Sequence, residues 1–167
     1  MMPADRGRWL AIDWGERRIG LALSDPSGMI ATPAGVIVRR AGKRPPVAEL
    51  VRRVEALEAR GIVMGLPLDG EGEDTPRALE CRRVAAELAR RTALPVALLD
   101  ERFTTSAALR GVRETGGRAQ DRKADIDALA AAVLLRQALR MHALPTVDPG
   151  EAAASDGHVT EADASAP

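Results

Sequence analysis

The sequence has few of the residues on which several common kinds of site depend. Cys81 is the only cysteine among 167 residues, which excludes a disulfide framework and a cysteine-rich metal site. Aromatic residues make up 2% of the chain and tyrosine is absent, so there are hardly any side chains on which the bases of a single strand could stack. Any contact with a nucleic acid is therefore expected to run mainly through phosphates and metal.

Long hydrophobic runs are also missing. The longest apolar run, Ala128 to Leu135, is far shorter than the roughly 20 residues that cross a bilayer. No charged start is followed by a long apolar segment, as a secretory leader would require. We therefore expect no membrane partner, and the single cysteine leads us to expect a reducing, cytoplasmic setting.

Neither sign of charge is in excess overall, because 24 basic residues balance 24 acidic ones. The balance is uneven along the chain: residues 147–167 contain five acids and no Lys or Arg, which leaves residues 1–146 with a net charge of +5. Nearly all the basic residues are arginine, and only Lys43 and Lys123 are lysine. Arginine binds phosphate well through its planar guanidinium, which is one explanation of this excess. A genome rich in G and C would favour arginine codons, and this explains the excess equally well.

The order of predicted elements indicates one α/β domain over residues 1–146, followed by a disordered acidic tail over residues 147–167. Short apolar runs predict five strands, at residues 9–13, 19–24, 36–39, 62–66 and 95–99. Apolar positions at helical spacing and Gly or Pro boundaries predict four helices, at residues 45–60, from 75 onward, at 105–112 and at 123–142. The first three strands should form an antiparallel meander, and the later strands should add in parallel beside the first. The predicted fold is a mixed five-stranded sheet with helices on both faces.

The stretch LAIDWGERRIGLALSD, residues 10–25, places a carboxylate where an α/β fold binds ligands. Asp13 ends an apolar strand, and the crevice outside the carboxyl ends of strands is the usual site in such folds. A strand holds the carboxylate oxygens rigidly, which suits a ligand of Mg²⁺. Because one carboxylate is not enough for such a site, partners must come from other elements.

Two further stretches offer those partners. In LLDERFTT, Asp100 and Glu101 follow the fifth strand, and neighbouring strand residues point to opposite faces. Only one of the two can face the first aspartate unless the strand has already ended. In DRKADIDALAAAVLL the candidates are Asp121, Asp125 and Asp127. The first two of these are typical of a helix N-cap or first turn. The last two each share a helix face with apolar residues, so periodicity does not decide between them.

Four stretches together resemble the motifs of one family. LAIDWGERRIGLALSD, IVMGLPLDGEGEDTPRA, LLDERFTT and IDALAAAVLL follow the motif order of the YqgF/RuvX-like family and cover about residues 8–141. That family comprises pre-16S rRNA nucleases of bacteria and is similar to Holliday junction resolvases. The resemblance implies a ribonuclease H-like fold. Trp14 and Phe103 depart from the family's usual residues, and we expect Trp14 to pack in the core rather than to contact substrate.

The resemblance also implies which carboxylates act. It implies that Asp13, Glu101 and Asp127 are the catalytic residues and the ligands of Mg²⁺ or Mn²⁺, and it thereby chooses between the alternatives that the residue patterns left open. Two metal ions in such a site activate water and stabilise the leaving oxygen while a phosphodiester bond is hydrolysed.

Basic residues near these motifs are the candidates for substrate binding. We expect Arg17 and Arg18 to grip a neighbouring phosphate, and Arg102 either to do the same or to pair with a local acid. Residues 65–72 are expected to line the substrate path or to form an ordinary loop. The Gly116–Gly117 loop, with arginines at 113, 118 and 122, is expected either to clamp the backbone or to be solvated.

The resemblance implies a nuclease that processes the 5′ end of pre-16S rRNA in ribosome biogenesis, with pre-rRNA and ribosomal precursor particles as partners. One alternative is resolution of branched, four-way DNA junctions, which needs two active sites; the sequence fits a monomer or a homodimer. Another is a non-catalytic module that docks on ribosomes or transcription complexes, which would have little reason to retain three acids. An actin-like ATP-binding fold needs a second similar half, and the chain has no internal repeat to supply it.

Overall fold

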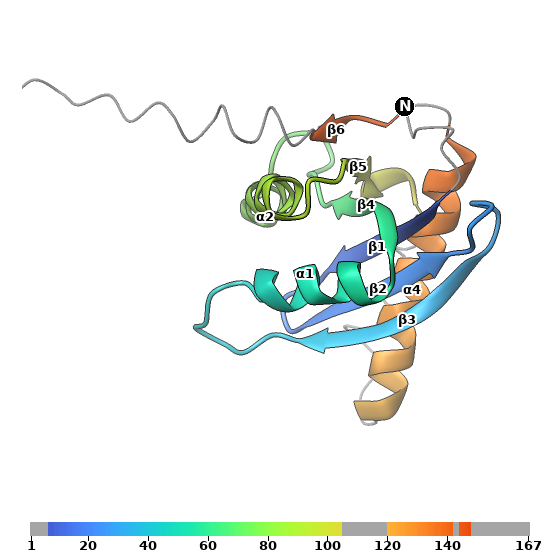
Figure 1. Cartoon of the computed structure of the whole chain (residues 1–167). Helices are drawn as coiled ribbons and strands as arrows, with labels where there is room; N and C mark the ends of the chain where they lie inside the picture. Colours follow the sequence, from blue (N-terminus) through green and yellow to red (C-terminus); the bar gives the residue numbers. More distant parts are fainter. Residues whose placement is uncertain (1–6, 105–119, 142–143, 148–167) are drawn as a thin grey trace, which may run out of the picture.

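The computed structural model describes residues 7–104, 120–141 and 144–147. Its strands are β1 (Arg8–Trp14), β2 (Arg18–Ser24), β3 (Ala31–Val38), β4 (Ala59–Leu66), β5 (Val96–Asp100) and β6 (Thr146–Val147). Its helices are α1 (Val47–Ala56), α2 (Pro76–Thr92), the 3₁₀ turn η1 (Glu101–Phe103) and α4 (Gln120–Arg140). The strands form one sheet in the order β3-β2-β1-β4-β5-β6, with α1 and α2 on one face and α4 on the other (Figure 1).

The strand directions match the prediction. β1, β2 and β3 form an antiparallel meander, and β4 and β5 add in parallel beside β1. A sixth strand, absent from the prediction, pairs antiparallel with the first half of β5. It has only two residues, which is too short for any alternation of apolar and polar side chains to be visible in the sequence. The mixed α/β sheet with helices on both faces is confirmed, with six strands in place of five.

Alternation along β1 divides the core into two layers. Leu10, Ile12 and Trp14 point toward α1 and α2 and belong to the larger cluster of buried residues. Trp9 and Ala11 point the other way, toward α4, and belong to the second cluster. Because successive strand residues face opposite sides, Asp13 lies on the α4 face of the sheet. This layer contains many alanines, which lets α4 lie close to the strands.

Several predicted boundaries were wrong. The third strand begins at Ala31, not at residue 36, because it continues past Pro33 and Gly35 through an irregularity in its pairing with β2. The first helix ends at Ala56, ahead of the predicted stop at Gly61. Glu58 adopts a left-handed conformation with φ of 53°, which turns the chain into β4 directly. The last helix spans residues 120–140 in place of 123–142.

Three predictions fall wholly or mainly on residues that the structure does not describe. The short helix at residues 105–112 and the Gly116–Gly117 loop both lie in the undescribed segment 105–119. The predicted acidic tail, residues 147–167, is also outside the described residues from residue 148 onward, whereas Val147 lies in β6. Within the described part of the chain, no helix is long and apolar enough to cross a membrane.

Gly20 sets how closely α4 approaches the sheet, and its replacement tests this packing. A Cβ atom at Gly20 would lie 2.0 Å from the carbonyl oxygen of Asp127, so Gly20→Ala must push α4 away from β2. We expect this variant to lose at least about 2 kcal/mol of unfolding free energy in urea denaturation. Gly70→Ala is the control, because a Cβ there meets nothing within 4 Å. Equal stability of the two variants would contradict this account of the packing.

Candidate active site

The first candidate carboxylate, Asp13, lies one residue before the end of β1. It is fully buried, and it faces α4. Its partner across the antiparallel β1–β2 pair is Gly20, which has no side chain on the same face. No side chain of β2 therefore fills the space beside Asp13 on this face of the sheet.

The backbone of α4 occupies that space. A Cβ atom at Gly20 would come within 2.0 Å of the Asp127 carbonyl oxygen and within 3.2 Å of the Ala128 nitrogen. The helix thus crosses the sheet with Asp127 directly above the position that pairs with Asp13. Asp127 is 1% exposed, whereas Asp125 is exposed on the surface of the helix. The structure brings Asp127, and not Asp125, to the site.

Glu101 reaches the same face from the end of β5. The strand ends at Asp100, and Glu101 begins the 3₁₀ turn that follows. A Cβ atom at Gly65 would lie 1.8 Å from the Glu101 carboxylate oxygen, so the carboxylate lies where a side chain at residue 65 would otherwise be. Gly65 follows Met64, the β4 residue that pairs with Ile12 of β1. Strand β5, which Glu101 directly follows, and strand β1, which carries Asp13, therefore flank the strand of Gly65.

Burial makes these three carboxylates costly unless they are compensated. Asp13, Glu101 and Asp127 are exposed by 0%, 4% and 1% respectively. A buried ionised carboxylate needs ion pairs, hydrogen bonds or a metal to hold it. For Asp127, the Arg18 guanidinium supplies one such partner, with Nε donating to Oδ2 at 2.8 Å. Arg18 is thus turned inward to a carboxylate, where the sequence led us to expect a contact with phosphate.

Arg102 also pairs with a carboxylate, which was one of its two predicted roles. Its guanidinium donates to both oxygens of Asp100, the shortest contact being 2.8 Å from Nη2 to Oδ2. These hydrogen bonds lower the pKa of Asp100 below its ordinary value and raise the pKa of Arg102. Arg102 also lies against the loop at Gly70 and Gly72, so this part of residues 65–72 packs on an ion pair. Of the three predicted phosphate ligands, Arg17 alone is exposed.

The opposite face of the sheet holds a second polar cluster around Trp14. The indole Nε1 donates to Glu80 at 2.9 Å, and the Arg39 guanidinium lies 4.6 Å from the centre of the ring. Arg39 also donates to the carbonyl oxygen of Gly15 at 2.9 Å and to Glu80 at 2.7 Å. Burial raises the pKa of Glu80, but the hydrogen bonds from Trp14 and Arg39 outweigh burial and leave it below its ordinary value. Trp14 packs in the core, as expected, and holds the turn that follows Asp13.

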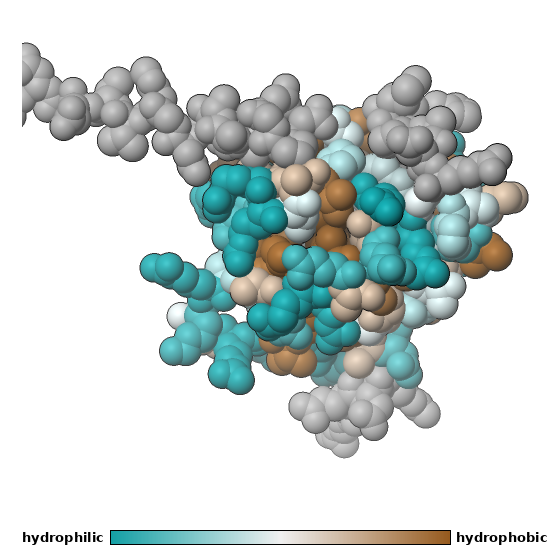
Figure 2. All heavy atoms as spheres, viewed as in Figure 1, coloured by the Kyte–Doolittle hydropathy of each residue, from teal (hydrophilic) through white to brown (hydrophobic). Residues whose placement is uncertain are grey.

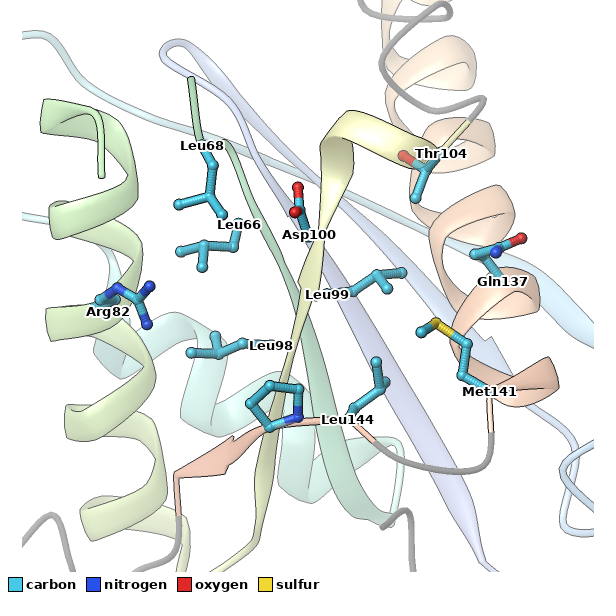
Figure 3. A pocket seen from close by; sticks show the side chains of 11 residues that line it. Leu66, Leu68, Arg82, Leu98, Leu99, Asp100, Thr104, Gln137, Met141 and Leu144 are labelled. Atoms are coloured by element: carbon cyan, nitrogen blue, oxygen red, sulfur yellow. The ribbon is translucent and has the colours of Figure 1, made fainter. Parts of the chain in front are cut away.

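The alternation at the end of β5 separates the two acids of the DER motif in the same way. Figure 3 shows Leu98 directed toward α2 and Leu99 directed toward α4, on the two sides of the strand. Asp100 follows on the α2 side, where it lines a pocket of about 370 Å³ together with Leu66, Leu68 and Leu98. Leu99, Gln137 and Met141 also line this pocket, so it extends past β5 to the α4 side of the sheet, but Glu101 is not among its lining residues.

The three carboxylates are the kind of ligand that a hard divalent cation takes, since Mg²⁺ and Mn²⁺ bind carboxylate oxygens. Their oxygens do not converge on one point in this conformation. Among residues 7–104, 120–141 and 144–147, no three Asp, Glu, His or Cys side chains are placed so that they could hold a metal together. The bond between Arg18 and Asp127 directs one oxygen of that carboxylate toward β2.

Sequence reasoning missed the two glycines that make room for the site. Gly20 and Gly65 each lie inside a strand, where a glycine often marks the close approach of another part of the chain. That signal was present in RIGLALS and in ARGIVMGL. The contact between Arg39 and Glu80 was also missed, because those residues are 41 positions apart.

Comparison with known proteins agrees with this geometry. Residues 7–141 match the family described as RuvX, Holliday junction resolvase. The chain belongs to the RuvX family. This confirms the family to which the four motifs pointed, and the match extends from β1 to the C-terminal end of α4, which leaves out only β6 among the described strands.

Curated relatives of this RuvX chain carry a name that refers to RNA. A protein of Streptomyces avermitilis named "Putative pre-16S rRNA nuclease" is 41% identical over 153 residues, which cover 90% of this chain and 96% of the relative. Proteins of the same name from Koribacter versatilis and Mycolicibacterium smegmatis are 40% and 44% identical. These matches cover 87% and 78% of this chain, and 95% and 79% of the two relatives.

Solved structures confirm the fold class. The RuvC structure from Thermus thermophilus in complex with a Holliday junction substrate superposes with a TM-score of 0.54 at 13% identity, covering 84% of this chain and 99% of that one. A second structure of the same RuvC gives a TM-score of 0.53 at 12% identity, with the same coverage. The RuvX chain therefore has the ribonuclease H-like fold that the motifs led us to expect.

Removal of the Arg18 guanidinium tests its role as a partner of the buried Asp127. Arg18 is 22% exposed and Asp127 is 1% exposed, so the pair lies between exposed and fully buried ion pairs. We expect Arg18→Gln to lower the unfolding free energy by about 2 kcal/mol, measured by urea denaturation. Arg17→Gln, one position earlier and exposed, should change it by less than about 0.5 kcal/mol. A double variant with Asp127→Asn measures the coupling, which would be zero if the pair contributed nothing.

The pairing of Asp100 with Arg102 predicts a dependence of stability on pH. The folded pKa of Asp100 lies below its ordinary value of 3.8, so the pair stabilises the fold above that pH and loses this contribution as the pH falls further. We expect Asp100→Asn to be less stable than the parent protein at about pH 5 to 7. The difference should shrink steadily as the pH approaches the folded pKa. A difference that stays constant down to about pH 2 would contradict the pairing.

Proposed function

We propose that this RuvX-family protein is a metal-dependent nuclease that processes the 5′ end of pre-16S rRNA in the cytoplasm. The observation that carries the proposal is the burial of three carboxylates, from β1, η1 and α4, on one face of the sheet at the carboxyl ends of its strands. The family match and the names of the relatives support nucleic acid as the substrate. Ribosomal precursor particles are the partners that this reaction implies.

Asp13, Glu101 and Asp127 are the residues that would hold Mg²⁺ or Mn²⁺. A bound divalent ion would make water a better nucleophile and would stabilise the leaving oxygen of the phosphodiester. The chain supplies rigidity: β1 fixes Asp13, and the space left by Gly65 fixes Glu101. Asp127 is held in place by the contact of α4 with Gly20 and by Arg18, which also balances part of the negative charge before any ion arrives. The low exposure of all three carboxylates keeps bulk water away from them.

Resolution of four-way DNA junctions is the second candidate. The description of the family and the fold shared with RuvC bound to a Holliday junction favour it. It requires two active sites on one junction, and therefore a dimer, whereas cleavage of an rRNA precursor does not. A non-catalytic docking protein is the third candidate, and the three buried acids argue against it.

Matched variants test the proposal. We expect the native protein to cut an end-labelled pre-rRNA leader with Mg²⁺ or Mn²⁺ and to leave it intact with EDTA. Asp13→Asn, Glu101→Gln and Asp127→Asn should each slow cutting at least about 100-fold. Asp100→Asn and Asp125→Asn are the controls, because each lies close in sequence to a site residue yet points away from the site, and both should retain activity.

The same variants are run on a four-way DNA junction. Paired cuts in the junction with intact RNA would move the assignment to a resolvase. If both substrates stay intact with every metal, the protein is not a nuclease of either kind. If Asp125→Asn abolishes cutting and Asp127→Asn does not, the assignment of the helix carboxylate is wrong.

A further inference from the structure

Within the part of the chain that the structure describes, the loop between β3 and α1 carries a concentration of exposed positive charge at the same end of the sheet as the site. Residues 39–46, RRAGKRPP, contain four basic residues and no acid. Arg40, Lys43 and Arg44 are exposed, and none of them belongs to an ion pair between described residues. In Figure 2 hydrophilic side chains project from the molecule at the side where this loop lies in Figure 1.

Arg39 fixes the root of this loop to the turn that follows Asp13. Its backbone nitrogen donates to the carbonyl oxygen of Arg17 at 2.8 Å, and its guanidinium donates to the carbonyl oxygen of Gly15 at 2.9 Å. The stack on Trp14 and the bond to Glu80 hold the same guanidinium from the other side. The start of the loop is therefore held at the end of the sheet at which Asp13 lies, and Arg40, Lys43 and Arg44 follow directly from it.

A nucleic-acid substrate would need exposed cations near the three carboxylates. Three buried carboxylates repel a phosphodiester, and Arg18 and Arg102 are each bonded to an acid. A substrate backbone therefore needs positive charge at the rim of the site. Arg17 and the loop supply it on the same end of the sheet, since Arg18 pairs with Val38 at the last position of β3.

We propose that Arg17, Arg40, Lys43 and Arg44 form a track that binds the phosphates of a nucleic-acid strand leading away from the carboxylates. The inference rests on the site of the proposed function, but it concerns binding and can be measured without cleavage. Phosphates are the partner because the loop has no aromatic residue on which a base could stack. A lipid surface is disfavoured because the loop has no large apolar residue to insert.

The test is RNA binding in EDTA, followed by fluorescence anisotropy with a labelled single-stranded RNA over a series of KCl concentrations. The triple variant Arg40→Gln, Lys43→Gln and Arg44→Gln should bind at least about 10-fold more weakly at low salt. Its slope of log affinity against log salt should be smaller by about 2, since each phosphate that the protein neutralises on a single strand contributes roughly 0.7 to the slope. In cleavage assays the triple variant should raise KM and leave kcat unchanged.

A matched triple variant provides the control. Arg60→Gln, Arg90→Gln and Arg91→Gln removes the same charge from exposed positions at the opposite end of the sheet, near the starts of β4 and β5. It should bind RNA almost as the parent does. Equal weakening in the two triple variants would show a general charge effect and would overturn the proposal.

Two further outcomes separate this inference from the proposed function. If the parent protein cuts RNA and the loop variant binds it unchanged, the track is wrong and the nuclease stands. If the parent binds RNA through the loop and cuts nothing, the track stands and the nuclease is wrong.

Vesicles of phosphatidylglycerol and phosphatidylcholine form the last arm: loop-dependent binding to them with unchanged RNA affinity would identify a lipid surface and overturn the proposal.

Discussion

The close contact between α4 and β2 at Gly20 is the constraint on which the site depends. A helix normally lies about 10 Å from a sheet because side chains fill the space between them. Here Gly20 has no side chain and the layer contains many alanines, so the backbone of the helix at Asp127 lies against the strand itself. Asp127 is thereby carried into the layer beside Asp13, across a distance that its short side chain could not otherwise bridge.

The same constraint explains why Arg18 is turned inward. Once Asp127 is buried, its charge needs a partner within the layer, and Arg18 lies on the strand that α4 crosses. The guanidinium at 2.8 Å satisfies one oxygen of the carboxylate. Strand β2 therefore does both things on one face: Gly20 lets α4 approach, and Arg18 pairs with the acid that the helix carries.

How much could be predicted from the sequence follows from these contacts. The five strands marked by short apolar runs, their directions and the position of Asp13 at the end of β1 came from local patterns. The choice of Asp127 over Asp125 did not, because both share a helix face with apolar residues. It came from the family resemblance, and the close approach of α4 at Gly20 is its structural reason. The contact of Arg39 with Glu80, and the pairing of Arg18 with Asp127, join residues 41 and 109 positions apart. No short-range pattern could have revealed either of them.

Because strand residues alternate, the site carboxylates at the ends of β1 and β5 face α4, and their neighbours in sequence face α2. At the end of β1, Asp13 faces α4 and Trp14 faces α2, where its bond to Glu80 and its stack with Arg39 hold the following turn. At the end of β5, Glu101 faces α4, while Asp100 lies on the α2 side and holds Arg102 against the neighbouring loop. Each of these two acids therefore has a neighbour in sequence that stiffens the adjoining loop from the opposite face. Because Arg39 is at once part of that stiffening cluster and the first residue of the basic loop, the rigidity of the carboxylate site extends directly into the surface that carries the exposed positive charge.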